Sequence, residues 1–219
     1  MASIQDTGLF ITFEGGEGAG KTTQIKLLKS YLEDKDYHVL LTREPGGTPE
    51  AEKIRDLLVQ RDGGEWTSEA ETLLLFAARH MHVEKLIKPA LSKGTIVLCD
   101  RFTDSTRAYQ SYGHGMPLDY VERINSFVLN EFSPDITFIL DIDPEEGLSR
   151  SRSHLSQTSN AREQSEDRFE AMELDFHRNL RRGFLEIADK NPERCHVIDA
   201  KKHINDIHIS VKEIIDRHV

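Results

Sequence analysis

The feature that most constrains the fold is a regular alternation of short apolar runs with longer helical patterns. Runs this short, without alternating polar residues, are typical of strands that are buried on both faces. Five such runs occur: "LFITFE" (9–14), "HVLLT" (38–42), "TIVLCD" (95–100), "ITFILDI" (136–142) and "CHVID" (195–199). Helical patterns lie near residues 21–34, 49–60, 68–93, 118–131, 144–153, 166–190 and 204–219. Strands that alternate with helices are joined by right-handed crossovers, so we predict a three-layer α/β fold, a five-stranded parallel sheet flanked by helices.

Length and composition predict one globular domain over residues 1–219. Charged residues make up 30% of the chain, and no apolar run approaches the ~20 residues that a membrane span needs. The start, "MASIQDTG", has no basic region leading into an apolar core, so we expect no secretory signal and a cytoplasmic location. Cys99 and Cys195 lie far apart and fit no metal spacing, which favours two buried thiols over a disulfide.

The net charge of −10 argues against nucleic acid as a partner, because an acidic surface repels a phosphate backbone. A phosphate-bearing partner is therefore expected to be a small molecule in a locally basic pocket. The histidines show no HExxH or other paired ligand spacing, so we expect no structural metal site.

The segment "FEGGEGAGKTT" lies directly between the first expected strand and the first expected helix. It completes the pattern G-x-x-x-x-G-K-[ST], in which glycines let the backbone wrap a phosphate and the following helix adds its positive N-terminal field. Lys21 supplies a charge to the outer phosphates, and the Thr22 hydroxyl can hold Mg²⁺. We predict that this loop binds a nucleoside triphosphate through Gly15, Gly16, Glu17, Gly18, Ala19, Gly20, Lys21, Thr22 and Thr23.

Two classes of nucleotide-binding protein fit poorly. A GTPase switch needs the N-K-x-D and D-x-x-G motifs, and the chain has neither. A motor ATPase is normally larger and carries partner-sensing elements with no obvious counterpart here. Small phosphotransferases remain, and these need a second site for the phosphoryl acceptor.

Candidate parts of that second site follow two other strands, at the edge where parallel sheets bind ligands. Arg43 comes after the second strand in "TREPGGTP", and Arg101 after the third in "DRFTDSTRAYQ". We expect both guanidiniums to bind phosphate oxygens, with structural ion pairs as the alternative. Asp100 ends an apolar strand, where a carboxylate suits Mg²⁺; a helix cap or an ion-pair partner is the alternative. The Glu44-Pro45 step predicts a special turn, with a cis peptide as one option.

Four segments in order, "FEGGEGAGKTT", "TREPGGT", "LLFAARHMHVEKLIKPAL" and "DRFTDSTRAYQ", resemble bacterial thymidylate kinase. The resemblance covers nearly the whole chain. It implies a P-loop nucleoside monophosphate kinase fold, ATP and dTMP as substrates, dTDP and ADP as products in dTTP synthesis, Mg²⁺ as cofactor, and a homodimer. Two rivals stay open: a kinase of another small acceptor, and a nucleotide-dependent binding switch without acceptor chemistry.

The resemblance also implies roles for individual residues. Glu17 matches a carboxylate aimed at the 3'-hydroxyl of the acceptor sugar, and Asp100 matches one beside the metal. The other matches are Arg43 and Arg101 at the acceptor phosphate, Phe76 and Arg79 stacking on thymine and contacting its carbonyl edge or the phosphate, and Ser105, Tyr109 and Gln110 closing over base and sugar. For Ser105 and Gln110 the alternative is a helix cap or a surface group. Phe76 has two alternatives, a place in the core or replacement by Leu75 at the base. Tyr109 is expected to exclude a ribose 2'-hydroxyl.

The catalytic arginine is expected in a lid, defined as approximately residues 149–168. Some family members carry arginine in the phosphate loop, where this chain has Gly18, so it resembles the type that delivers arginine from the lid. The serine-rich sequence predicts a mobile excursion over the surface. We favour Arg152, then Arg150, over Arg162 and Arg168, with solvated lid charges as the alternative. Lys21 and Arg101 are the other expected catalytic residues, and no general base is needed because a phosphate monoester ionises near pH ~6.

Overall fold

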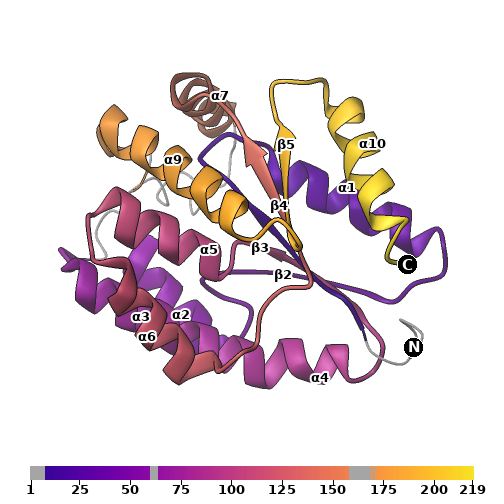
Figure 1. Cartoon of the computed structure of the whole chain (residues 1–219), viewed down its shortest axis with the longest axis horizontal. Helices are drawn as coiled ribbons and strands as arrows, with labels where there is room; N and C mark the ends of the chain where they lie inside the picture. Colours follow the sequence, from indigo (N-terminus) through magenta and orange to yellow (C-terminus); the bar gives the residue numbers. More distant parts are fainter. Residues whose placement is uncertain (1–7, 60–63, 158–168, 170) are drawn as a thin grey trace.

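The computed structural model describes residues 8–59, 64–157, 169 and 171–219. Its centre is one sheet of five strands that pair in parallel in the order β2-β3-β1-β4-β5. The strands are β1 (Phe10–Glu14), β2 (Val39–Arg43), β3 (Ile96–Asp100), β4 (Ile136–Asp141) and β5 (Cys195–Asp199). Helices cover both faces of the sheet (Figure 1). The predicted three-layer α/β fold is confirmed.

One face of the sheet is covered by α1 (Lys21–Glu33) and α10 (Ile204–Ile215), and the other by α2 (Pro49–Val59), α3 (Ser68–His82), α6 (Leu118–Leu129) and α9 (Leu174–Lys190) (Figure 1). Alternate residues of a strand point to opposite faces. Ile11 and Phe13 accordingly join the core beneath α1 and α10, whereas Phe10 joins a second cluster with Val97 and Cys99. The predicted burial on both faces holds for β1, β3 and β4, whereas the edge strands β2 and β5 are only partly buried.

The long helix predicted over residues 68–93 is divided. Helix α3 ends at His82, a π-helical segment η1 (Val83–Ile87) follows, and α4 (Lys88–Leu91) carries Pro89 in its first turn. The helix starts at Ser68 as predicted, and the hydroxyl of Thr67 accepts the cap hydrogen bond from the Ala70 N–H at 3.3 Å.

Two elements between β3 and α6 were not predicted, α5 (Thr103–Thr106) and the π-helical η2 (Arg107–Gly113). Their buried side chains include Thr103, Asp104, Thr106 and Gln110, which are polar. The usual 3.6-residue apolar pattern is therefore missing. Thr106 and Gln110 line the site described below, and Asp104 is buried with its ion-pair partners Arg107 and Arg194.

The serine-rich lid is helical over the part that the structure describes. Helix α7 (Pro144–Gln157) contains the helix predicted over residues 144–153 and continues four residues further, so the expected irregular excursion is corrected for the described residues of the lid. Asp143 caps the helix by accepting from the Glu145 N–H at 3.1 Å, and an Arg150–Glu146 pair at 2.6 Å supports the second turn. Residues 158–168 lie outside the described part of the chain.

Both cysteines are buried and free, as predicted. Burial raises the pKa of each thiol above its ordinary value, to about 12 for Cys195. Among the described residues, no helix has the length and apolar character to cross a membrane.

Candidate active site

The carboxyl ends of β1, β2 and β3 bring the predicted phosphate-binding residues together. In the parallel register, Phe13 of β1 and Arg43 of β2 both pair with Asp100 of β3. The glycine-rich loop leaves β1 one residue beyond Glu14 and enters α1 at Lys21. The loop, Asp100 and Arg101 therefore share one edge of the sheet, as expected of strand ends in a parallel sheet.

The phosphate loop packs directly on the start of α7. Gly18 has φ +65, and a Cβ at this position would clash with the carbonyl oxygen of Gly147 in α7. A side chain here is excluded by both the backbone conformation and the space. The structure thus gives a physical reason why this loop carries no arginine at residue 18.

Lys21 folds back over its own loop. Its Nζ donates to the carbonyl oxygens of Gly15 at 3.0 Å and Gly16 at 2.9 Å. Burial, followed by the nearby positive charge of Arg101, lowers the pKa of Lys21. The ammonium thus lies at the start of the phosphate loop. This position suits a lysine that binds the outer phosphates of a nucleotide.

Thr22 and Asp100 form the predicted metal pair. The Thr22 hydroxyl donates to Asp100 Oδ2 at 3.0 Å, which joins the start of α1 to the end of β3. A hydroxyl and a carboxylate oxygen at this distance are hard donors of the kind that Mg²⁺ prefers. The residues present therefore fit a magnesium ion held jointly with nucleotide phosphates.

A cavity of about 150 Å³ opens beside the phosphate loop. Six of the residues predicted to bind the acceptor line it: Glu17, Arg79, Arg101, Ser105, Tyr109 and Gln110. They come from the loop, α3, the end of β3, α5 and η2. We call this space the acceptor cavity.

Arg101 connects the phosphate loop to the acceptor cavity. Its Nη1 donates to the Gly15 carbonyl oxygen at 3.1 Å and to Ser105 Oγ at 3.2 Å, and its Nη2 contacts Glu17 Oε1 at 2.9 Å. The Tyr109 hydroxyl donates to the same Glu17 oxygen. Burial alone would raise the pKa of Glu17, but Arg101 and then Lys21 outweigh it and lower the pKa to about 2. Glu17 is therefore an anion at neutral pH.

Glu14, which the sequence analysis did not single out, is joined to this network through Ser105. Its carboxylate is fully buried at the end of β1, where it accepts from the Phe102 N–H at 2.7 Å and from Ser105 Oγ at 2.5 Å. Burial, together with the negative charge of Asp104, raises the pKa of Glu14 to about 7. In the sequence, Glu14 is only the last residue of an apolar strand.

Arg79 lies on the floor of the acceptor cavity with a side chain that is 2% exposed. Its Nε donates to Glu44 Oε2 at 2.7 Å, and its Nη2 donates to the Phe102 carbonyl oxygen and to Thr106 Oγ1. Its Nη1 has no hydrogen-bond partner among the residues that the structure describes. That nitrogen is the part of the guanidinium left to bind a ligand.

The structure favours the two alternatives stated for Phe76, because it places Leu75 in the cavity lining and Phe76 in the core. Phe76 is 1% exposed and packs with Met116 and Val121. One helical step turns the side-chain direction by about 100°, so adjacent residues cannot share a face. Phe76 instead lies beneath Arg79, with the guanidinium carbon 4.8 Å from the ring centre.

Gln110 faces the acceptor cavity with a fixed amide orientation. Its Nε2 donates to Glu71 Oε1 at 2.7 Å, and its own Oε1 has no partner among the described residues. A carboxylate only accepts hydrogen bonds, so Glu71 holds the amide nitrogen on its side. Gln110 thereby offers an acceptor oxygen to a ligand.

The comparisons with known proteins agree with this geometry. A family model described as thymidylate kinase matches residues 13–211. The chain belongs to the thymidylate kinase family. The activity predicted from the sequence, phosphoryl transfer from ATP to dTMP, is the activity of this family and is confirmed.

Curated relatives and a solved structure cover almost all of the chain. It is 44% identical over 208 residues to the thymidylate kinase of Caulobacter vibrioides, covering 95% of this chain and 96% of the relative. For the thymidylate kinase of Geotalea daltonii the identity is 45% over 205 residues, covering 93% and 94%. The crystal structure of thymidylate kinase from Ehrlichia chaffeensis matches with a TM-score of 0.74 and 40% identity, covering 95% of this chain and 98% of that one.

One arginine of this thymidylate kinase site lies differently from expectation, and another was not predicted. Arg43 is not among the cavity-lining residues; its side chain is 47% exposed and contacts Glu52 Oε2 at 3.3 Å. Its role at the acceptor phosphate stays a prediction. Arg55, which the sequence analysis missed, lines the cavity from α2 and donates to the Pro45 carbonyl oxygen at 3.0 Å. A lone arginine inside a helix gives no signal in the sequence, because many such residues are solvated.

The two arginines of α7 point to different places, as their spacing predicts. Arg150 donates to Glu146 and, at 2.9 Å, to the Ala200 carbonyl oxygen beyond β5. Arg152 is exposed and lies close enough to buried His177 to help lower the pKa of that imidazole, although burial is the larger cause. His177 lines a small cavity together with Gly15, Gly16 and Glu17 of the phosphate loop. Arg162 and Arg168 lie outside the described residues.

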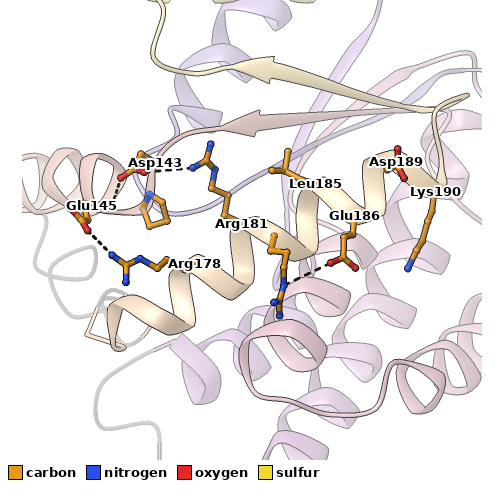
Figure 2. Close-up of a pocket in the computed structure, with 10 residues that line it drawn as sticks. Asp143, Glu145, Arg178, Arg181, Leu185, Glu186, Asp189 and Lys190 are labelled. Atoms are coloured by element: carbon orange, nitrogen blue, oxygen red, sulfur yellow. Dashed lines mark hydrogen bonds and ion pairs between the residues drawn. The ribbon is translucent and has the colours of Figure 1, made fainter.

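A wide surface groove of about 650 Å³ lies between the start of α7 and α9 (Figure 2). Its cations are matched by acids: Arg178 contacts Glu145 at 3.0 Å, and Arg181 contacts Asp141 at 2.7 Å and Asp143 at 3.6 Å. An anionic ligand would have to compete with these carboxylates. None of the predicted donor or acceptor residues lines this groove.

Proposed function

We propose that the chain transfers the γ-phosphoryl group of ATP directly to the phosphate of dTMP, giving ADP and dTDP. The observation that carries this proposal is the position of Arg101. It bonds to the Gly15 carbonyl oxygen in the phosphate loop and lines the acceptor cavity. A guanidinium in this position neutralises charge where the donor and acceptor phosphates meet.

On the donor side, the phosphate loop holds ATP through residues 15–23, and the Lys21 ammonium swings from the Gly15 and Gly16 carbonyl oxygens onto the outer phosphates. Thr22 and Asp100 would hold Mg²⁺, which neutralises charge on the donor phosphates when bound. The acceptor phosphate is already an anion at neutral pH, so positioning and charge neutralisation are the main requirements.

On the acceptor side, Glu17 is an anion at the cavity wall and accepts from the sugar 3'-hydroxyl. The free Nη1 of Arg79 and the Oε1 of Gln110 are one donor and one acceptor for the pyrimidine edge. Ser105 and Tyr109 close the wall beside the sugar. Arg43 binds the acceptor phosphate after leaving its exposed pair with Glu52.

The remaining catalytic charge comes from the lid, with Arg152 favoured over Arg150. Gly18 leaves the phosphate loop without a guanidinium, and Arg150 is engaged with Glu146 and Ala200. Arg152 is exposed near His177, which borders the phosphate loop. One arginine at the transferring group is worth roughly 10³ to 10⁵ in rate.

We further propose a cytoplasmic homodimer. Three large apolar side chains are exposed on the neighbouring helices α3 and α6: Leu73 by 58%, Tyr120 by 52% and Phe127 by 88%. Tyr120 and Phe127 are seven residues apart and therefore lie on one face of α6. Exposed apolar groups gathered on adjacent helices support an interface between two copies.

An acceptor panel tests the function. The purified protein is mixed with Mg-ATP and dTMP, dUMP, dCMP or AMP, and ADP release is measured, with Lys21→Ala as the control. We expect dTMP to be used with the highest kcat/KM, and Lys21→Ala to lose at least 100-fold in rate (an estimate of about 3 kcal/mol) without losing its fold. Equal use of all four monophosphates, or ADP formation that does not depend on any of them, would contradict the proposal.

A further inference from the structure

We infer that His82 is a positioning residue for the acceptor, acting through Glu44 on Arg79. This inference rests on the proposed acceptor site. His82 is the last residue of α3 and is 0% exposed. It does not line the acceptor cavity, so it cannot touch the acceptor itself. It acts on Arg79 through one intervening carboxylate.

The chain of contacts runs from the sheet to the cavity. The Glu44 carboxylate contacts His82 Nδ1 through Oε1 at 2.9 Å and receives the Arg79 Nε–H through Oε2 at 2.7 Å. On its other side, His82 Nε2 contacts Thr42 Oγ1 at 2.7 Å. Each oxygen of Glu44 therefore has one dedicated partner. His82 and Arg79 reach the same carboxylate because residues three apart lie on one side of a helix.

The position of one imidazole hydrogen follows from the Glu44 contact. A carboxylate only accepts, so His82 Nδ1 carries a hydrogen and donates it to Glu44. In the neutral ring Nε2 then accepts, and the Thr42 hydroxyl is its donor. The imidazole cannot rotate without breaking both hydrogen bonds. It thus fixes Glu44, whose second oxygen in turn fixes the plane of the guanidinium.

The loop after β2 is packed against the same ring. Gly47 has φ +86, and a Cβ on it would lie 2.5 Å from Cδ2 and Nε2 of His82. Glu44 itself is held by its N–H, which donates to the Asp100 carbonyl oxygen at 2.9 Å. His82 therefore fills the space between this loop and α3. Because Glu44 and Pro45 line the acceptor cavity, the imidazole supports that wall from behind.

The orientation of Arg79 is what this arrangement controls. Its Nε and Nη2 are used by Glu44, Phe102 and Thr106, and only Nη1 remains for a ligand. A guanidinium is planar, so fixing Nε fixes the direction of Nη1. A buried network of this kind couples its members, typically by 2- to 100-fold in an equilibrium constant. Loss of His82 should therefore weaken acceptor binding and leave ATP binding unchanged.

A double-mutant cycle tests the inference. His82→Leu is measured in the wild-type and in the Arg79→Ala background, with KM determined for dTMP and for ATP. We expect His82→Leu to raise the KM for dTMP about tenfold and the KM for ATP less than twofold. In the Arg79→Ala background the same substitution should change the KM for dTMP less than twofold. His82→Asn, which keeps an N–H donor at the place of Nδ1, should recover most of the loss.

Two results would overturn the inference. One is an unchanged KM for dTMP in His82→Leu; the other is an equal rise in both backgrounds, which would mean that His82 acts independently of Arg79. If His82→Leu does not fold, the cycle is repeated with Thr42→Val, which replaces only the hydroxyl with a methyl group. There we expect a severalfold rise in KM for dTMP that disappears in the Arg79→Ala background.

Failure of the proposed function would look different. In that case the wild-type protein would not use dTMP, whatever residue 82 is. The Arg79 Nε–H signal in nitrogen-15 NMR then gives a readout without turnover. We expect slow exchange with solvent in the wild type and in His82→Asn, and faster exchange in His82→Leu. Equal exchange rates in the three proteins would show that His82 does not hold the Glu44–Arg79 contact.

Discussion

Tyr109 shows how much one side chain contributes at this site. Its hydroxyl donates to Glu17, its ring lies 5.0 Å from the Arg101 guanidinium carbon, and its edge meets Phe169 and Phe176. Burial, followed by the charge of Glu17, raises the pKa of Tyr109 well above its ordinary value. The phenol therefore stays neutral and keeps its donor hydrogen. The ring and the hydroxyl can be tested separately, because the ring fills space and the hydroxyl makes a hydrogen bond.

Substitutions at Tyr109 separate these tasks. Tyr109→Ala removes the ring that is proposed to fill the space of a ribose 2'-hydroxyl, so the ratio of kcat/KM for dTMP over ribo-TMP should fall at least tenfold (about 1.4 kcal/mol). Tyr109→Phe is the matched control: it keeps the ring and loses the hydrogen bond to Glu17. We expect the control to lower activity with dTMP while preserving the sugar preference. An unchanged preference in Tyr109→Ala would show that another group excludes ribose.

Glu14 makes folding depend on pH in a specific window. Its pKa is raised from 4.5 to about 7, so between these values the folded protein binds a proton that the unfolded chain has lost. Its contribution to stability is present below pH 4.5 and is lost as the pH rises through about 7. The size of this loss is on the order of 3 kcal/mol. Other groups also make the free energy of unfolding depend on pH. The useful quantity is therefore the difference in this free energy between the wild type and a Glu14 variant.

Glu14→Gln isolates that contribution, because the amide has no titration and its oxygen still accepts from Phe102. Urea unfolding of both proteins at pH 5, 6, 7 and 8 gives the free energies. Relative to the wild type, the variant should gain stability from pH 5 to pH 8 by up to about 3 kcal/mol. Two curves that stay parallel over this range would mean that Glu14 keeps an ordinary pKa.

The residues that could be predicted from the sequence are those whose position follows from strand ends. Lys21, Thr22, Asp100 and Arg101 converge because parallel strands end at one edge, and a motif marked the loop. Leu75 was not preferred over Phe76, since their choice depends on the rotation of α3. Buried polar residues such as Glu14, Glu44 and His82 gave no distinct signal, because partners distant in sequence create their roles.

At the scale of elements, α7 connects the phosphate loop with the lid. Its first turns contact the loop closely at Gly147, and it continues as a helix to Gln157. The sequence analysis ended this helix at residue 153 because the serine-rich segment shows no apolar face, while i,i+4 pairs and the cap at Asp143 support the helix locally. Elements with buried polar faces, α5 and η2 above all, were missed for the same reason.

The helical geometry of α7 sharpens the prediction for its two arginines. Arg152→Ala should lower kcat at least 100-fold (an estimate of about 3 kcal/mol) with little change in the dissociation constant for dTMP, because the contact forms chiefly in the transition state. Arg150→Ala is the matched control on the same helix and should lower kcat less than tenfold. The measurements are single-turnover rates and dTMP binding by calorimetry. If both variants keep wild-type rates, the charge comes from Lys21, Arg101 and a residue beyond α7.

On the scale of the whole molecule, the alternation of strands and helices was enough to predict a parallel three-layer fold. The strand order β2-β3-β1-β4-β5 was not predicted, because apolar runs do not specify which strands are neighbours. The order has a consequence for the site. Placing β1 in the centre puts the phosphate loop between Asp100 on one side and α7 on the other. The acceptor cavity therefore lies on the β3 side of the loop, and α7 packs against the loop on the β4 side.

The face formed by Leu73, Tyr120 and Phe127 gives a test of the proposed dimer. Phe127→Asp places a charge at the most exposed apolar residue of that face, and burying an unpaired carboxylate costs several kcal/mol, so dimer affinity should fall at least 100-fold. Ile209→Asp on α10 is the matched control, since Ile209 is also exposed, by 48%, and lies on the opposite face of the sheet. Sedimentation equilibrium at micromolar concentration should give twice the chain mass of 25.0 kDa for the wild type and the control, and the single mass for Phe127→Asp.

Activity should also fall when the dimer dissociates. Helix α6 contacts η2 through Glu122 and Arg107 at 2.6 Å, and η2 carries Tyr109 and Gln110. A wild-type monomer, or a Phe127→Asp variant that dimerises normally, would show that this face is not the interface.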